Sequence, residues 1–252
     1  MADDLNGKVA IVTGGARDIG RAISMKFGAL GASVVVNYND SSEEAEKTLK
    51  DLEAIGANAT AIQADVSKEE GVSNLLEKAT EKLGKSIDIL VNNAGGLVKR
   101  SPVVEMEESL WDKVMTINLK SVFLMCRATI PYLKNGSAII NISSLAARSG
   151  GGPGAVPYAT AKGGVLTFTR ALAKELAPKR IRVNCVEPGV IATRFHDVFT
   201  NPEVRKNFPN TIPLGREGEA NEVAAAVAFL AGDASTYITG EALQINGGIY
   251  FI

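Results

Sequence analysis

Tyr158 and Lys162 are the two side chains of this sequence best suited to acid–base chemistry. They lie four residues apart, so on a helix the phenol and the ammonium share one face and reach the same volume. An ammonium close to a phenol lowers the phenol pKa, which suits proton exchange with an alcohol or carbonyl oxygen near neutral pH. The spacing alone is also typical of a solvated helix face, so its meaning depends on the rest of the chain.

A glycine-rich turn upstream favours the catalytic interpretation. Residues 8–12 form a short apolar run that indicates a buried strand, and Thr13-Gly-Gly-Ala-Arg-Asp-Ile-Gly20 follows it directly. Apolar residues then recur at helical spacing from Ile19 to Leu30. A strand, a glycine turn and a helix N-terminus together expose backbone N–H groups to a pyrophosphate. Arg17 adds positive charge at this point. The two motifs predict a dinucleotide site next to acid–base groups.

The elements that must position these motifs alternate along the chain. Strands are expected at residues 9–12, 33–38, 59–64, 87–92, 137–142, 181–186 and 242–245, and helices at 19–30, 42–55, 69–83, 107–134, 156–177 and 219–231. This rhythm predicts the α/β class: a Rossmann-type doubly wound parallel sheet of about seven strands with helices on both faces. No long linker interrupts it, so residues 1–252 are expected to form a single domain.

Composition argues against several classes of protein. Nearly half of the residues are apolar and the formal net charge is −1, with no basic block, so neither nucleic acid nor an anionic membrane is an expected partner. The acidic start lacks the apolar region of a signal peptide, and no run approaches the length of a membrane span. Cys126 and Cys185 lie in apolar surroundings and are expected to be buried free thiols. A cytoplasmic protein follows. The single histidine, His196, and the lack of clustered acids predict no metal site.

Several short motifs follow one another along the chain: Thr13-Gly14 to Gly20, Asp65-Val66, Asn92-Asn93-Ala94-Gly95, Asn118, Ser143-Ser144, Tyr158 with Lys162, and Pro188-Gly189 with Thr193. With these residues the sequence resembles the short-chain dehydrogenase/reductase family over nearly its whole length. The resemblance implies an NAD(P)-dependent oxidoreductase that interconverts a carbonyl and an alcohol. A cofactor-binding sensor or scaffold is the non-enzyme alternative, and the complete set of catalytic side chains argues against it.

The resemblance assigns four catalytic residues. Tyr158 would be the general acid toward the carbonyl oxygen, and Ser144 would hydrogen-bond the same oxygen. Lys162 would hold the nicotinamide ribose and lower the pKa of Tyr158. Asn118 would bind, through its backbone, a water that connects Lys162 to solvent. Ser143 remains an alternative to Ser144, because both follow the strand at 137–142.

The cofactor is expected where the strands end, as in other doubly wound sheets. By resemblance, residues 92–95 line the adenosine side, Asp65 and Val66 flank the adenine, and Thr193 contacts the nicotinamide carboxamide. Asp65 could instead cap the following helix, although Ser67 fits that role better. The residues expected to bind the cofactor are Gly14, Arg17, Asp18, Ile19, Gly20, Asn37, Tyr38, Asp65, Val66, Asn92, Ala94, Gly95, Tyr158, Lys162, Pro188, Gly189 and Thr193.

Three features depart from the family pattern. Asp18 stands where glycine is usual; aspartate is one of the few other residues that enter the left-handed region readily. Its carboxylate would be unfavourable near a pyrophosphate unless Arg17, Arg21 or the helix N-terminus compensates. Glu187 replaces a residue that is usually neutral, and the loop before Tyr158 is about one residue longer than usual.

The second expected strand ends in Asn37-Tyr38-Asn39, which are neutral, whereas an acidic residue there would repel a 2′-phosphate. Together with Arg17, this predicts NADPH as the favoured cofactor, with NADH not excluded. Nearby Asp40, Glu43 and Glu44 act in the opposite direction.

For the substrate, two expectations stand. Residues 93–100, 150–155, 193–197 and 246–250 are similar to those of reductases of 4-deoxy-L-erythro-5-hexoseulose uronate, the keto acid of alginate breakdown, which is reduced to 2-keto-3-deoxygluconate. The alternative is a 3-oxoacyl-(acyl-carrier-protein) reductase of fatty-acid synthesis. An acidic sugar needs cations near its carboxylate. The candidate substrate residues are Lys99, Arg100, Arg148, Arg194 and His196.

The protein is also expected to be a homotetramer, as most relatives are. The helices at 107–134 and 156–177 carry more apolar residues than one sheet face can cover, and a second subunit would bury the excess. The residues expected to need such cover are Val122, Phe123, Met125, Leu166, Phe168, Leu172 and the tail 249–252.

Overall fold

Seven short strands form one parallel sheet in the order β3-β2-β1-β4-β5-β6-β7. We describe the protein from a computed structural model, which covers residues 4–251. The strands are β1 (Val9–Val12), β2 (Ser33–Tyr38), β3 (Ala59–Gln63), β4 (Ile87–Asn92), β5 (Leu133–Ile142), β6 (Arg182–Pro188) and β7 (Ala242–Ile245). Every neighbouring pair runs parallel. The predicted Rossmann-type sheet is therefore confirmed.

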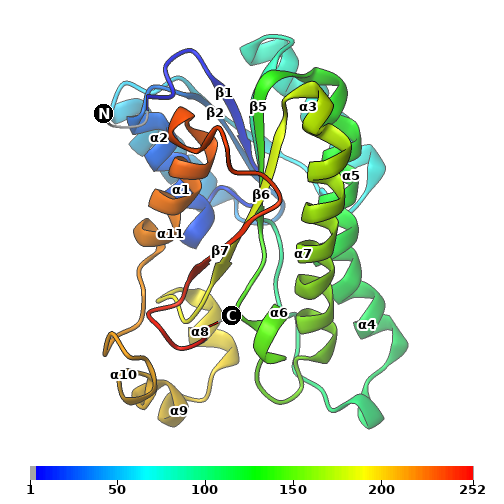
Figure 1. Cartoon of the computed structure of the whole chain (residues 1–252), viewed down its shortest axis with the longest axis vertical. Coiled ribbons are helices and arrows are strands. Elements are labelled where there is room, and N and C mark those ends of the chain that lie inside the picture. The colour runs from blue at the N-terminus through cyan, green and yellow to red at the C-terminus, as the bar shows by residue number, and fades with distance from the viewer. Residues whose placement is uncertain (1–3, 252) are drawn as a thin grey trace.

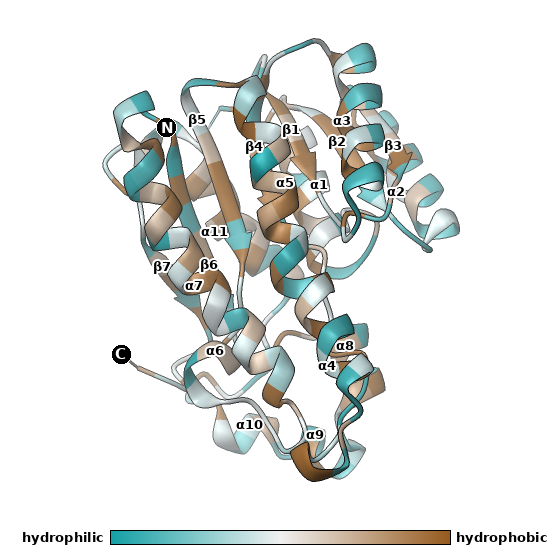
Figure 2. Cartoon of the chain, turned by 90° about the vertical axis from the view of Figure 1, so that its right-hand side faces the viewer, coloured by the Kyte–Doolittle hydropathy of each residue, from teal (hydrophilic) through white to brown (hydrophobic). Residues whose placement is uncertain are grey.

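Helices cover both faces of this sheet (Figure 1). One face carries α1 (Asp18–Ala29), α2 (Ser42–Ala54) and α11 (Ala220–Ala231), and the other carries α3 (Glu69–Leu83), α5 (Ser121–Thr129) and α7 (Val156–Leu176). Consecutive residues of a strand point to opposite faces, so Val12 packs with the α1 and α11 layer while Ile11 packs with the α3, α5 and α7 layer. Figure 2 shows that the strands are largely apolar, whereas the helices carry hydrophilic residues alongside apolar ones.

The long predicted helix at 107–134 is interrupted. It consists of α4 (Glu108–Met115), a wider π-helical turn at Thr116–Lys120 and α5, and β5 begins at Leu133, four residues before the predicted 137. Asn118 lies inside the wide turn, where its side-chain amide donates to the carbonyl of Val114 at 2.9 Å. Such single π turns are frequent at functional sites. The predicted helical stretch is thus confirmed over residues 108–132, with a local change of helical pitch that apolar periodicity does not report, and residues 133 and 134 belong to β5.

Four short helices were not predicted. They are α6 (Ala146–Ser149), α8 (Arg194–Phe199), α9 (Pro202–Lys206) and α10 (Phe208–Thr211). Each is too short to show a helical period, and two contain proline at the start. Residues 194–211, which we call the cap, lie beyond the carboxyl ends of the strands, between β6 and α11 (Figure 1).

The apolar argument for oligomerisation was wrong for most residues that carried it. Val122, Met125, Leu166 and Leu172 are buried against this chain's own sheet. Phe123 is exposed, and Phe168 is partly covered by the same core. Of the tail, Phe251 is exposed, whereas Ile252 lies outside the described residues.

Both cysteines are buried free thiols, as predicted. Burial raises the pKa of Cys126 and of Cys185 to about 12, so neither is a reactive thiolate near neutral pH. Within residues 4–251, none of the helices has the length and apolar character needed to cross a bilayer.

Candidate active site

A cavity of about 1150 Å³ lies at the carboxyl edge of the sheet and contains most of the predicted site residues. The glycine turn, the ends of β2, β4, β5 and β6, the start of α7 and the cap all contribute to its wall. At one end lie Tyr38 and Asp65, and at the other Tyr158 and Phe195. A parallel sheet brings these segments together because all its strands end on the same side.

Tyr158 and Lys162 both point toward this cavity from α7. The Lys162 ammonium lies 5.7 Å from the centre of the Tyr158 ring, as their spacing predicts. Its Nζ donates to the carbonyl oxygen of Ile142 at 2.8 Å, where β5 ends. Lys162 is only 4% exposed, and this burial lowers its pKa to about 8. The lysine is therefore poised to exchange a proton near neutral pH.

The expected effect of Lys162 on Tyr158 is not what the structure shows. Burial raises the pKa of the Tyr158 phenol, and the neighbouring Ser144 hydroxyl is the group that lowers it. Although the ring borders the cavity and is partly exposed, protein atoms surround the hydroxyl closely enough to disfavour a charge there. Tyr158 is thus a protonated phenol at neutral pH, which suits proton donation to a carbonyl oxygen.

The structure also separates the two adjacent serines. The Ser143 hydroxyl donates to the backbone carbonyl of Lys162 at 2.8 Å and is buried. Ser144 borders the cavity, and its oxygen accepts the N–H of Ala146 at 3.1 Å, which leaves its proton available. The geometry favours Ser144 as the hydroxyl that meets a substrate.

Asn118 lies behind the cavity wall and is fully buried. Its side-chain amide donates to the Gly96 carbonyl at 2.8 Å, and its oxygen accepts the Gly96 N–H at 3.0 Å. A Cβ on Gly95 would come within 2.6 Å of the Asn118 oxygen and 3.3 Å of the Lys162 nitrogen. Asn118 therefore joins the end of β4 to the wide helical turn, close to Lys162.

The glycine turn has the shape of a pyrophosphate cradle. Gly14 has a φ of +60°, and a Cβ on Gly20 would overlap the carbonyl of Gly14, so both positions require glycine. Asp18 has a φ of +50°, which confirms that aspartate can replace the usual glycine here. Its carboxylate accepts the backbone N–H of Arg194 at 3.2 Å. Arg21 pairs with Asp51 instead of Asp18, so it is not the expected compensating charge.

Two predicted cofactor residues are used for structural hydrogen bonds. Asn92 is buried; its amide donates to Asn141 and to the Cys126 sulfur, and it does not border the cavity. The buried Asn37 amide donates to the carbonyl of Ala64 at 3.0 Å, although the residue still forms part of the cavity floor. Asn92 was therefore wrongly predicted to bind the cofactor, because a strand-end amide can equally join adjacent strands.

Neither capping assignment near Asp65 holds. The Asp65 carboxylate accepts both the N–H and the hydroxyl of Ser67, and these bonds lower the pKa of Asp65 against the effect of burial. Lys68 occupies the N-cap position of α3 and no side chain caps the helix. Asp65 and Val66 both border the cavity, as do the remaining predicted cofactor residues: Gly14, Arg17, Asp18, Ile19, Gly20, Tyr38, Ala94, Gly95, Pro188, Gly189 and Thr193.

The predicted cluster of substrate cations does not form. Lys99 is exposed outside the cavity, and Arg148 is held by Glu187 behind its wall. Arg100 borders the cavity but donates to the carbonyls of Phe199 and Pro153, each at 2.9 Å. Arg194 and His196 also border the cavity, and their side chains do not donate to backbone carbonyls as Arg100 does.

Aromatic residues of the cap form a cavity wall that was not predicted. The Phe195 ring centre lies 5.8 Å from that of Tyr158 and 5.3 Å from that of Phe199. His196 contacts both Phe195 and Phe208 edge-on, its Nδ1 lies 2.8 Å from the Thr200 hydroxyl, and burial lowers its pKa. The signal in the sequence was the recurrence of phenylalanine at 195, 199 and 208 after Thr193.

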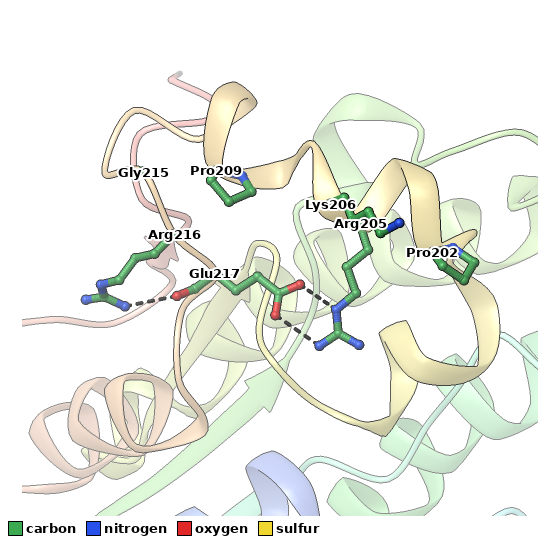
Figure 3. A pocket seen from close by; sticks show the side chains of 7 residues that line it. All are labelled: Pro202, Arg205, Lys206, Pro209, Gly215, Arg216 and Glu217. Atoms are coloured by element: carbon green, nitrogen blue, oxygen red, sulfur yellow. Dashed lines mark hydrogen bonds and ion pairs between the residues drawn. The ribbon is translucent and has the colours of Figure 1, made fainter.

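A second hollow, of about 490 Å³, lies beside α9 and α10 and is more open (Figure 3). Its cations are already paired with carboxylates: Arg205 with Glu217 at 2.7 Å, and Lys206 and Arg216 with neighbouring glutamates. The Arg205 pair joins the cap to Glu217, and the lining has no unpaired cation to hold an anion. The first cavity is the site.

Comparisons with known proteins agree with this geometry. Residues 14–250 match the family described as Enoyl-(Acyl carrier protein) reductase. The 3-oxoacyl-(acyl-carrier-protein) reductase FabG of Staphylococcus aureus is 38% identical over 96% of this chain and 98% of its own length. The corresponding reductase of Staphylococcus epidermidis is also 38% identical, over 96% and 99% of the two chains.

Solved structures show the same fold. A blue fluorescent protein from a metagenomic library, in complex with NADPH, has a TM-score of 0.91 and 36% identity, over 98% of this chain and all (100%) of that one. A 7α-hydroxysteroid dehydrogenase, complexed with NADH and 7-oxo glycochenodeoxycholic acid, has a TM-score of 0.92 and 32% identity, over 97% and 95%. The chain belongs to the short-chain dehydrogenase/reductase family of NAD(P)-dependent oxidoreductases.

Proposed function

We propose that the protein reduces the 3-oxo group of an acyl thioester, using NADPH. The cofactor supplies the hydride. Tyr158 donates its phenolic proton to the carbonyl oxygen, and Ser144 hydrogen-bonds the same oxygen as negative charge develops on it. Lys162 returns a proton to Tyr158, since its lowered pKa places it near the working pH. Asn118, through its backbone, holds a water that connects Lys162 to solvent.

The aromatic wall is the observation that favours an acyl substrate. Phe195 packs against Tyr158, Phe199 packs against Phe195, and Phe208 borders the same cavity, so a chain attached to the reacting carbonyl would meet this wall. Each buried methylene contributes about 0.8 kcal/mol of transfer free energy, so this wall rewards an apolar chain. The similarity to two 3-oxoacyl-(acyl-carrier-protein) reductases supports the same substrate class.

The acidic keto sugar of alginate breakdown is the second candidate. Arg194 and His196 border the cavity and could meet a carboxylate. Lys99 and Arg148 lie outside the cavity, and Arg100 donates to backbone carbonyls. Fewer cations are therefore available for the carboxylate of this substrate than the sequence predicts, and the acyl substrate is the better supported of the two.

A substrate comparison tests the proposal. With NADPH, acetoacetyl thioester should be reduced with a higher kcat/KM than 4-deoxy-L-erythro-5-hexoseulose uronate, and longer 3-oxoacyl thioesters should be better still.

Tyr158→Phe is the control, and it should lower turnover by about 10²–10⁴ while retaining NADPH binding. Faster reduction of the uronate would reject the acyl assignment, and a Tyr158→Phe enzyme with more than about a tenth of parental turnover would reject the role of Tyr158.

The NADPH preference is proposed from charge at the glycine turn. Arg17 borders the cavity, and the end of β2 offers Tyr38 and Asn39 instead of an acidic residue. Arg17→Ala should weaken NADPH binding by about 1.5–3 kcal/mol and NADH binding much less, because NADPH carries a charged 2′-phosphate that NADH lacks. Isothermal titration with both cofactors measures the difference.

Arg21 provides the matched control for that measurement. It lies one helical turn further along α1, pairs with Asp51 and does not border the cavity. Arg21→Ala should affect both cofactors alike. Equal weakening of NADPH and NADH by Arg17→Ala would contradict the assignment of Arg17 to the phosphate.

Burial of Lys162 makes a prediction about stability. Below pH 8 the folded and unfolded chains both carry a protonated lysine, and the folded state bears the full desolvation cost. As the pH rises from about 8 to 10.5, the folded lysine becomes neutral first and this cost disappears. Lys162→Met should therefore abolish activity yet raise the free energy of unfolding at pH 7 by about 1–3 kcal/mol. Urea unfolding of Lys162→Met and the parent should show the higher free energy of unfolding of the variant at pH 7 and no difference at pH 10.5. A variant that is less stable than the parent at pH 7 would contradict this prediction.

A homotetramer remains our proposal for the assembly. The exposed apolar side chains that support it are Val104, Phe123, Tyr237, Leu243 and Phe251, of which Leu243 lies on β7 at the edge of the sheet. Covering them would remove exposed apolar surface, and closed symmetry is the usual arrangement. Light scattering at micromolar concentration should give four chain masses of 26.5 kDa. A monomer at that concentration would contradict the proposal.

A further inference from the structure

A buried ion pair joins the segment that carries Ser144 to the end of β6. Arg148 donates from Nε to Oε1 of Glu187 at 2.9 Å and from Nη2 to Oε2 at 3.2 Å, a two-point contact between planar groups. Glu187 is 1% exposed. Neither member of the pair borders the cavity. Ser144, four residues before Arg148, and Pro188, which directly follows Glu187, both do.

The segment that carries Ser144 has little rigidity of its own. It continues into α6, which is only four residues long, and then into a loop in which Gly150, Gly151 and Gly154 have positive φ. Backbone bonds from Ser143 to Val186 and from Leu145 to Pro188, both 2.9 Å, tie its first residues to β6. The Arg148 side chain ties down the far end of the segment.

The other side of the pair is rigid. Glu187 and Pro188 are paired in register with Gln244 and Ile245 of β7, and the Gly189 N–H donates to the Ile245 carbonyl at 2.9 Å. β6 is also paired along its length with β5. We therefore expect the short α6 segment, and not the paired strand end, to be the side that shifts if the ion pair is lost.

We infer that Arg148 and Glu187 are positioning residues, which fix the Ser144 hydroxyl against Tyr158 through the two-point contact between them. The inference rests on the proposed role of Ser144. A buried ion pair adds little net stability compared with apolar side chains of the same size, so stability does not explain it. A role in fixing the direction of the segment explains the pair, because a guanidinium and a carboxylate meet in one planar geometry, whereas apolar side chains can shift against one another.

Glu187→Gln tests this with the shape of the side chain retained. Its kcat should fall by about 10- to 100-fold, the range expected for a catalytic group displaced by up to an ångström. KM for the carbonyl substrate and Kd for NADPH should change by less than about twofold, since neither residue borders the cavity. Arg148→Lys, which retains the charge without the planar fork, should lower kcat in the same way.

The Ser144→Ala background distinguishes positioning from a general structural effect. If the pair acts through Ser144, adding Glu187→Gln to Ser144→Ala should lower kcat no further, within about twofold. A structural effect would multiply the two losses, and that result would overturn the inference. If Ser144→Ala itself leaves kcat unchanged, the proposed role of Ser144 fails instead.

Stability and a matched surface pair supply the controls. Arg148→Met with Glu187→Met should retain the melting temperature of the parent and still show a low kcat; full activity in this variant would also overturn the inference. Arg216→Gln removes another two-point pair, with Glu222 on the surface, and should leave kcat unchanged.

A measurement without substrate completes the set. Ser144 lowers the pKa of Tyr158, so Glu187→Gln should raise the pH at which the tyrosinate absorbance of Tyr158 develops, in the same direction as Ser144→Ala. Subtracting the Tyr158→Phe titration isolates the signal. An unshifted titration in Glu187→Gln, beside a shifted one in Ser144→Ala, would overturn the inference whatever the substrate is.

Discussion

A lysine ammonium placed out of water at the edge of the sheet is the constraint on which the rest of the site depends. Lys162 is stabilised there because its Nζ donates a hydrogen bond to the carbonyl oxygen of Ile142 at 2.8 Å, where β5 ends. Gly95 must lack a side chain for the same reason, since a Cβ there would crowd both Lys162 and Asn118. The parallel sheet meets these conditions by ending β4 and β5 side by side. The lowered lysine pKa is a consequence of the architecture.

The parts of the site that were predictable are encoded locally. Tyr158 and Lys162 share a helical face because of their spacing, and the glycine turn is defined by residues that few others can replace. The Asp18 exception was also predictable, because its conformation is a property of the residue type. The sheet followed from alternating apolar runs, whose burial on both faces is typical of parallel strands.

The parts that were not predictable depend on which residues meet across long stretches of chain. Arg148 looked like a substrate cation until Glu187, 39 residues later, was found to bind it. Arg100 likewise binds a carbonyl 99 residues away. The pKa of Tyr158 depends on how closely protein atoms surround its hydroxyl, which spacing does not reveal. In each case the sequence shows the side chain, but not the distant surroundings that fix its role.

This difference explains why the reaction is easier to infer than the substrate. The groups proposed to move protons stand on strand ends and on α7, whose positions the sheet fixes, so their roles can be inferred once the fold is known. The groups proposed to contact the rest of the substrate stand on the cap, which consists of short helices held by ion pairs such as Arg205–Glu217. Such a segment can exchange its side chains, for example Phe195 or Phe208, without disturbing Lys162 or β5. With the proposed substrate contacts, substrate preference depends on the least regular part of the chain, and it has to be measured on the cap's own side chains.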